Sequence, residues 1–98
     1  MSYGLRDSDI QTIQKVGKQW PEIEEILLFG SRAKGNFKPG SDVDLAVRGK
    51  NIGYDTVLHF EQFLNEETRL PYFFDVLHVE SLKEPDLLEH INRVGVAL

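Results

Sequence analysis

Two aspartates that alternate with aliphatic residues give the first indication of chemistry in this sequence. Asp42 and Asp44 lie two positions apart in a segment that reads as a β-strand, so their side chains project from one face, about 7 Å apart. Like charges at this spacing repel each other and resist burial. Carboxylate oxygens are the ligands that Mg²⁺ prefers, and the ion completes its shell with water and substrate phosphates. The pair therefore predicts a Mg²⁺ site, with two ions expected.

A glycine-serine pair precedes the aspartates and is suited to contact a phosphate. Gly30 and Ser31 follow the apolar run 26–29 and open a short helical turn, where backbone N–H groups and a hydroxyl can meet phosphate oxygens. Gly30 and Gly35 also match the glycines of a Walker A loop, but residues 36–37 are Asn-Phe where that loop needs Lys and Ser/Thr. A Walker-type NTPase is therefore not expected.

A third acidic residue, Asp75, interrupts the aromatic and aliphatic segment 72–79. A lone acid in a strand loses solvation and β-propensity unless it has a partner. One interpretation is a salt bridge, with Arg48 as a candidate, or an edge position. The other is a third carboxylate beside Asp42 and Asp44, and the presence of that pair favours this second interpretation. With three carboxylates, two metal ions can clamp the attacking and leaving oxygens of an in-line displacement.

These motifs together resemble the signature of a known family. The strings GSRAKG at 30–35 and SDVDL at 41–45, followed by a strand aspartate, are similar to the DNA polymerase β nucleotidyltransferase superfamily. The fuller pattern resembles its minimal nucleotidyltransferase (MNT) branch, the MntA-like antitoxins of HEPN/MNT pairs. The resemblance covers nearly the whole chain, and it implies a nucleotidyltransferase fold.

The resemblance also implies a role for each motif residue. The residues implied to bind the nucleotide phosphates are Gly30, Ser31, Arg32 and Lys34. The two basic residues among them would offset phosphate charge, although the family commonly has arginine at position 34. The residues implied to bind metal and to be catalytic are Asp42, Asp44 and Asp75. The last of these would help to deprotonate an acceptor hydroxyl.

Two functions follow from the resemblance. The first is transfer of a nucleoside monophosphate, with AMP from ATP expected, to a hydroxyl acceptor with release of pyrophosphate. The chain has no room for an acceptor-binding domain, so the acceptor would be a small helical HEPN partner that resembles an RNase, and the chain would act as its antitoxin. The alternative is a non-catalytic binding module that neutralises the same partner by complex formation. Pure binding does not need the three carboxylates.

The elements that must position these residues can be predicted from periodicity. With 98 residues, the chain is expected to form one domain over residues 1–98. Ser8 and Gln11 fit a capping box that opens a helix ending before Pro21. The order helix, strand, short helix, strand, helix, strand, helix then follows, and the short turn-rich connection 36–41 predicts that strands 26–29 and 42–48 are antiparallel. We expect a two-layer α/β (α+β) domain, with a small mixed sheet and helices mainly on one face.

Composition narrows the class of protein. The net charge of −5 argues against general nucleic-acid binding, whereas residues 31–50 hold five basic and two acidic residues and suit a small anionic ligand. The chain has no cysteine, which excludes disulfides and thiolate metal sites. No secretion signal or membrane-spanning run is present, so a cytoplasmic location is expected. The three histidines have no metal-site spacing and are interpreted as structural or surface residues; an oligomer is left open.

Overall fold

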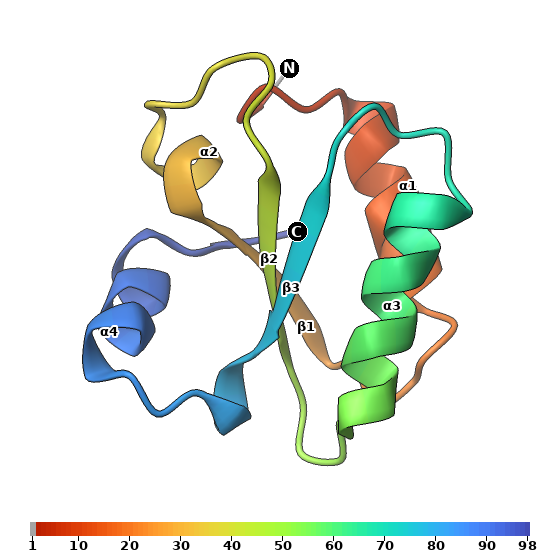
Figure 1. Cartoon of the computed structure of the whole chain (residues 1–98), viewed down its shortest axis with the longest axis vertical. Helices are drawn as coiled ribbons and strands as arrows, with labels where there is room; N and C mark the ends of the chain where they lie inside the picture. Colours follow the sequence, from red (N-terminus) through yellow and green to blue (C-terminus); the bar gives the residue numbers. More distant parts are fainter. Residues whose placement is uncertain (1) are drawn as a thin grey trace.

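The computed structural model describes residues 2–98 and has the element order predicted from the sequence (Figure 1). A 3₁₀ turn at Val79–Ser81 separates the third strand from the last helix. The helices and strands are α1 (Asp7–Gly17), β1 (Glu25–Phe29), α2 (Gly30–Lys34), β2 (Val43–Arg48), α3 (Tyr54–Glu66), β3 (Phe74–His78), α4 (Pro85–Val94) and β4 (Val96–Ala97).

The strands form one mixed sheet in the order β3-β2-β1-β4. β1 pairs antiparallel with β2, as the short connection between them predicts, and β4 pairs antiparallel with the other edge of β1. β2 and β3 are parallel, because α3 provides the crossover that a parallel pair requires. The central strand β2 therefore lies between the strand that leads into the Gly-Ser turn and the strand that carries Asp75.

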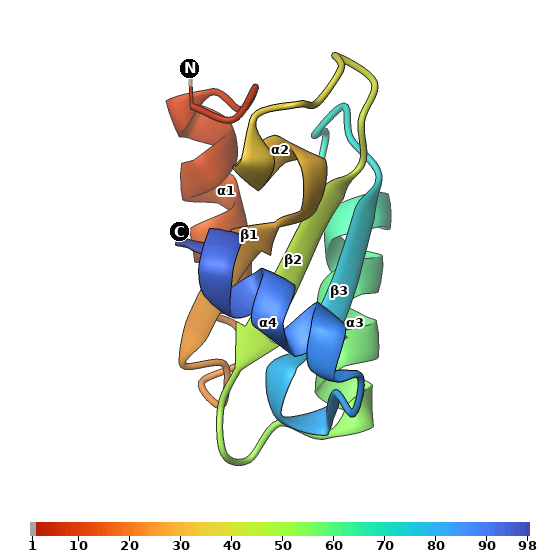
Figure 2. The same ribbon diagram turned by 90° about the vertical axis from the view of Figure 1, so that its left-hand side faces the viewer.

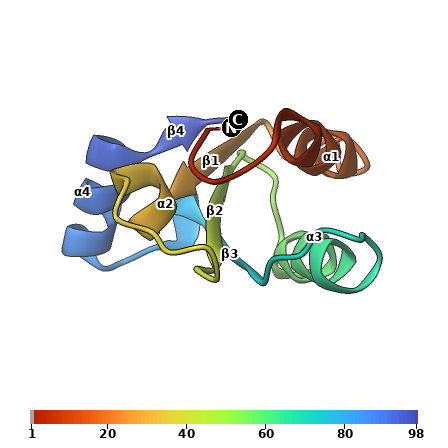
Figure 3. The ribbon, with the colours of Figure 1, turned by 90° about the horizontal axis from the view of Figure 1, so that it is seen from above.

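The two faces of the sheet have different partners. Val43, Leu45 and Val47 are fully buried in the larger core, on the face covered by α1 and α3 (Figure 3). A smaller core around Phe29 and Ile91 lies on the opposite face, where α4 crosses in front of the strands (Figure 2). The predicted fold class is confirmed: the sheet is small and mixed, and the two longest helices share one face, while α2 and α4 cover part of the other.

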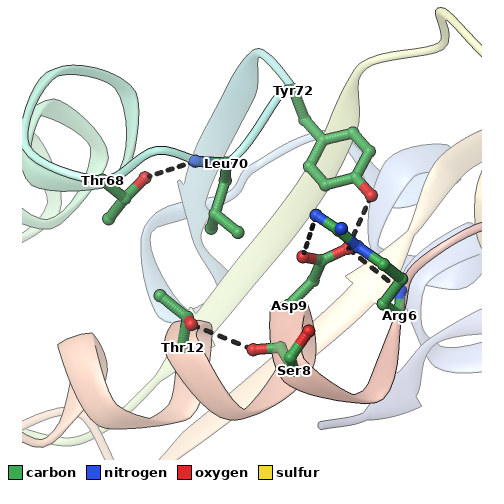
Figure 4. Close-up of polar contacts among 7 residues, drawn as sticks. All are labelled: Arg6, Ser8, Asp9, Thr12, Thr68, Leu70 and Tyr72. Carbon is green, nitrogen blue, oxygen red and sulfur yellow. Dashed lines mark hydrogen bonds and ion pairs between the residues drawn. The ribbon is translucent and has the colours of Figure 1, made fainter.

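The first helix begins earlier than its sequence pattern predicts. Ser8 and Gln11 lie within α1, and the residue that precedes the helix is Arg6. The backbone N–H of Arg6 donates to Oδ2 of Asp9 over 3.0 Å, and the Tyr72 hydroxyl donates to the same oxygen over 2.6 Å (Figure 4). Asp9 is 2% exposed. Its long-range partner Tyr72, which local sequence does not reveal, favours the earlier start.

The Asp9 cluster makes stability depend on acid pH. Burial by itself raises the pKa of Asp9, but hydrogen bonds from Tyr72 and Arg6 outweigh it and hold this pKa below its usual value. The fold therefore favours the ionised carboxylate. Its stabilising contribution is complete above the pKa of an unfolded aspartate, and it is lost as the pH falls through the lower folded-state pKa.

We expect Asp9→Asn to lower the free energy of unfolding at pH 7 by about 2 kcal/mol, because charge-assisted hydrogen bonds are lost. The loss of wild-type stability between about pH 5 and pH 2 should be shallower in this variant. Urea unfolding across this range measures both effects. Asp7→Asn, at an exposed position in the same turn, is the control and should retain the wild-type pH dependence; equal slopes for wild type and Asp9→Asn would contradict the prediction.

No helix among residues 2–98 combines the length and the apolar character that crossing a membrane requires.

Candidate active site

The sheet register brings the predicted carboxylates to one end of two neighbouring strands. Asp44 is paired with Phe29 of β1 on one side and with Asp75 of β3 on the other. Side chains at paired positions of adjacent strands point to the same face, with backbones about 4.8 Å apart. Asp42 lies two residues before Asp44, just outside β2. Asp42 and Asp75 are exposed and Asp44 is half-buried.

Of the two structural interpretations of Asp75, the ion pair with Arg48 is wrong, whereas the edge position is confirmed, because β3 is an edge strand and Asp75 is exposed on it. Arg48 donates to Oε1 of Glu25 over 2.6 Å, and these residues are direct partners in the antiparallel register of β1 and β2. Within residues 2–98, Asp75 takes part in no salt bridge. Its carboxylate is therefore free to act together with Asp44.

Repulsion among the carboxylates is visible at Asp44. Burial raises the pKa of Asp44, and the negative charges of Asp75 and Asp42 raise it further, against an opposing effect of His90. Gly30 contributes to this geometry because a Cβ at this position would collide with Oδ2 of Asp44. Because Gly30 has no side chain, the Asp44 carboxylate can lie directly beside the Gly-Ser turn.

The carboxylates fit a hard divalent cation by their chemistry. Over residues 2–98, no three His, Asp or Glu side chains are already gathered into a metal site. Asp44 and Asp75 nevertheless share one face of two adjacent strands, and Asp42 directly precedes β2. All three are oxygen ligands, and the repulsion that Asp75 and Asp42 exert on Asp44 is the kind that a bound cation removes. The residues present therefore fit Mg²⁺, the ion that the sequence predicts.

The Gly-Ser turn connects β1 to α2 directly. Gly30 has φ +74°, a left-handed conformation that favours glycine, and Ser31 is half-buried in the first turn. The Gly30 N–H donates to Nε2 of His90 over 3.3 Å, and the His90 ring packs edge-on against Phe29. His90 is a residue that sequence reasoning read as structural or surface, and it lies 60 positions from Gly30. This N–H is therefore already paired in the free chain, and a phosphate that binds it has to displace His90.

Arg32 does not face the site as the resemblance implies. Its side chain is 1% exposed, and its guanidinium lies between the rings of Phe37 and Tyr72, 5.2 and 5.0 Å from their centroids. The guanidinium donates to the carbonyl of Ser41 over 2.8 and 3.2 Å and to the carbonyl of Tyr3 over 3.0 Å. Arg32 thus fixes the loop that ends at Asp42, and phosphate cannot reach it without displacing this cover.

Lys34, in contrast, is exposed at the end of α2. The helix stops there because Gly35 adopts a left-handed conformation with φ +89°. Lys34 is therefore the basic residue of the motif that remains available to an anionic ligand.

The side chains that border the candidate site are accessible: Asp42, Asp75 and Lys34 are all exposed. The carboxylates lie at the upper end of β2 and β3 in Figure 1, next to α2 and the 35–42 loop. One hollow of about 510 Å³ lies between α1 and the β1/β4 edge and another of about 250 Å³ beside Trp20 and His59, and the three aspartates line neither of them.

Comparison with solved structures finds the same fold in toxin-antitoxin complexes. A crystal structure of a toxin-antitoxin with AMP-PNP is 22% identical with a TM-score of 0.72, over 95% of this chain and 72% of that chain. A mutant of the toxin-antitoxin MntA-HpeT is 23% identical with a TM-score of 0.70, over 96% and 72%. The structure of a tri-AMPylated HEPN toxin from Shewanella oneidensis in complex with MNT antitoxin is 21% identical with a TM-score of 0.66, over 89% of this chain and 66% of that chain.

Comparison with sequence families identifies the family. No curated protein sequence is detectably similar to the chain. Residues 11–98, however, match the model of the family described as Polymerase beta, Nucleotidyltransferase. This span includes the Gly-Ser turn, the paired aspartates and Asp75, so the family predicted from these motifs is confirmed: the chain belongs to the polymerase beta nucleotidyltransferase family.

Proposed function

We propose that this chain transfers AMP from ATP to a hydroxyl group of a HEPN-family protein and so acts as its antitoxin. The observation that carries the proposal is the placement of Asp44 and Asp75 opposite each other on adjacent strands, beside the Gly-Ser turn, with Asp42 directly before β2. A module that only bound a partner would have no need to hold three repelling carboxylates together.

The chain's own residues suit the steps of this reaction. The Ser31 hydroxyl binds the triphosphate together with the Gly30 N–H, which exchanges its His90 acceptor for a phosphate oxygen, and exposed Lys34 offsets part of the phosphate charge. The acceptor oxygen attacks the α-phosphorus and forms a new P–O bond, while the bond to the β-phosphate oxygen breaks and pyrophosphate leaves. Asp75 accepts the proton of the acceptor hydroxyl. Positioning and electrostatics supply most of the rate.

The residues that would hold Mg²⁺ are Asp42, Asp44 and Asp75, with two ions proposed. When bound, the ions would neutralise phosphate charge and lower the pKa of the acceptor hydroxyl. β2 and β3 fix the backbones of Asp44 and Asp75, and the three side chains would draw together around the ions, since they are not already gathered among residues 2–98.

Two observations support a macromolecular acceptor. The carboxylates of Asp42 and Asp75 are exposed, so a large molecule can reach them. The similar folds occur in toxin-antitoxin structures, one of which contains a tri-AMPylated HEPN toxin with an MNT antitoxin. We place the reaction in the cytoplasm, where ATP is available.

The test is transfer of label from ATP to the product of the gene adjacent to the one that encodes this chain, as the proposed HEPN partner. With Mg²⁺ and ATP labelled at the α-phosphate, the partner should become labelled; with ATP labelled at the γ-phosphate, the label should appear in pyrophosphate. Asp42→Asn/Asp44→Asn should give no transfer. Absence of transfer by the wild-type chain, or transfer by the double variant, would contradict the catalytic proposal.

The same double variant separates catalysis from binding. If it still suppresses the partner's activity at equal concentration, complex formation is sufficient for neutralisation and the chain acts as a binding module. If suppression is lost while the complex still forms, neutralisation requires the AMP group.

A further inference from the structure

One large apolar side chain is exposed next to the carboxylates. Phe73 is 56% exposed at the start of β3, and the other large hydrophobic residue exposed among residues 2–98 is Tyr54, at 79%. Tyr54 begins α3, at the end of the molecule opposite to the start of β3 (Figure 1). A single exposed apolar residue is common and by itself does not indicate a function. The position of Phe73 relative to the carboxylates, however, suggests a role for it.

The backbone of Phe73 is held by β2. The Val43 N–H donates to the carbonyl of Phe73 over 2.8 Å, which continues the parallel ladder by one residue beyond the first pair, Val43 with Phe74. Continuing the register places Phe73 beside Asp42, as Asp75 is beside Asp44. Since strand side chains alternate between faces, Phe73 shares the face of Asp75, whereas Phe74 is buried in the larger core.

The sheet order indicates which substrate passes Phe73. The Gly-Ser turn follows β1, and the paired aspartates lie at the beginning of β2. Asp75 is in β3, on the far side of β2 from β1, and Phe73 directly precedes β3. In the proposed function the triphosphate lies at the Gly-Ser turn, and Asp75 accepts the proton of the acceptor hydroxyl. The acceptor therefore approaches over β3, across Phe73.

We propose that Phe73 is a specificity-determining residue that packs against an apolar side chain of the protein acceptor, next to the hydroxyl that receives AMP. The inference rests on the proposed function and adds the apolar character of the acceptor segment to it. A phenyl ring that is more than half exposed in the free chain gains contact area without leaving a polar group unsatisfied. Its backbone is already fixed by β2, so little conformational entropy is lost on binding.

The experiment compares Phe73→Ala with wild type, with Tyr54→Ala as the matched exposed-aromatic control. We expect Phe73→Ala to raise the KM for the protein acceptor about tenfold, as for a moderate interface hot spot. The KM for ATP and the melting temperature should stay at wild-type values, and Tyr54→Ala should change none of the three. Phe73→Leu should recover most of the acceptor KM because it retains an apolar side chain.

Other outcomes overturn the inference. A rise in the KM for ATP with an unchanged acceptor KM would mean that Phe73 contacts the nucleobase, and an unchanged acceptor KM in Phe73→Ala would remove its role. If Phe73→Ala does not fold, Phe73→Ser and Phe73→Leu are compared instead, and equal acceptor KM values for these two would contradict an apolar contact.

A calorimetric titration separates the role of Phe73 from the proposed AMP transfer. The acceptor is titrated into the Asp42→Asn/Asp44→Asn chain with and without the same Phe73 substitutions. Loss of affinity with Phe73→Ala in this inactive chain supports the contact even if AMP transfer is never observed. An unchanged affinity overturns the contact while transfer by wild type stands. Absence of any binding and any transfer overturns the proposed function, and the inference with it.

Discussion

Asp44→Asn is expected to abolish AMP transfer and, at the same time, to stabilise the fold. Asp44 is the carboxylate with a neighbour on each side: Asp75 opposite in β3 and Asp42 two residues earlier in the chain. The substitution removes a proposed metal ligand, and this loss costs several kcal/mol of transition-state stabilisation. Such a cost corresponds to a decrease in kcat of about a thousandfold or more.

The stability change has the opposite sign because the folded chain disfavours the Asp44 charge. Burial and the two neighbouring aspartates raise the pKa of Asp44. The folded state therefore binds this proton more tightly than the unfolded state, so stability decreases as the pH rises through the window between the two pKa values. At pH 7 without Mg²⁺, we expect Asp44→Asn to raise the free energy of unfolding, by up to about 1 kcal/mol for relief of cross-strand repulsion.

Thermal melts with Mg²⁺ and with EDTA test this prediction. Mg²⁺ should raise the melting temperature of wild type but not of Asp44→Asn, because ligands stabilise only the state that binds them. Asp55→Asn, at an exposed position in the first turn of α3, is the control and should retain the response to Mg²⁺. A lower melting temperature for Asp44→Asn in EDTA would show that its charge is not a source of repulsion.

Arg32→Met is expected to destabilise the chain by about 3 kcal/mol, because several charge-assisted hydrogen bonds from a buried guanidinium to backbone carbonyls are lost. The guanidinium connects the carbonyls of Tyr3 and Ser41 across the two ring contacts. Arg32→Lys should recover little of this stability, since an ammonium cannot reproduce the planar fork of donors. AMP transfer should fall too, because the loop that ends at Asp42 loses its support.

Lys34→Met provides the matched comparison, two residues along the same short helix. Lys34 is exposed, so its substitution should change the free energy of unfolding by less than about 0.5 kcal/mol and should raise the KM for ATP. Urea unfolding and steady-state kinetics distinguish the two residues. If Arg32→Met kept wild-type stability and only weakened ATP binding, Arg32 would be a phosphate ligand after all.

The parts of the site that follow from local pattern could be predicted from the sequence. Strict alternation in residues 42–48 predicts both the strand and the common face of the two aspartates, and the short connection predicts its antiparallel pairing with β1. Glycine after an apolar run predicts the turn, which the structure shows at φ +74°. Each of these depends on residues a few positions apart, where periodicity and steric rules act directly.

The parts that were missed depend on contacts between distant segments. Arginine is usually exposed, and nothing near Arg32 in the sequence reveals that Tyr72 and Tyr3 enclose it. His90 meets Gly30 across 60 positions. The first helix also begins earlier than predicted, because Asp9 accepts a hydrogen bond from Tyr72, 63 residues away. Polar and aromatic residues do flank the motif in the sequence. Their presence, however, does not specify which distant residues they contact in the fold.

The alternation of β2 has a consequence for how this chain reaches its working geometry during folding. Val43, Leu45 and Val47 are fully buried on one face, and Asp44 lies on the other. A slip of one residue in strand pairing would exchange the faces and carry aspartates into the core, at a cost far above the repulsion that correct pairing leaves between Asp44 and Asp75. The apolar residues behind the site thus select the correct strand register. Chains with a shifted register fail to fold, and chains that fold have Asp44 and Asp75 on the same face of the sheet.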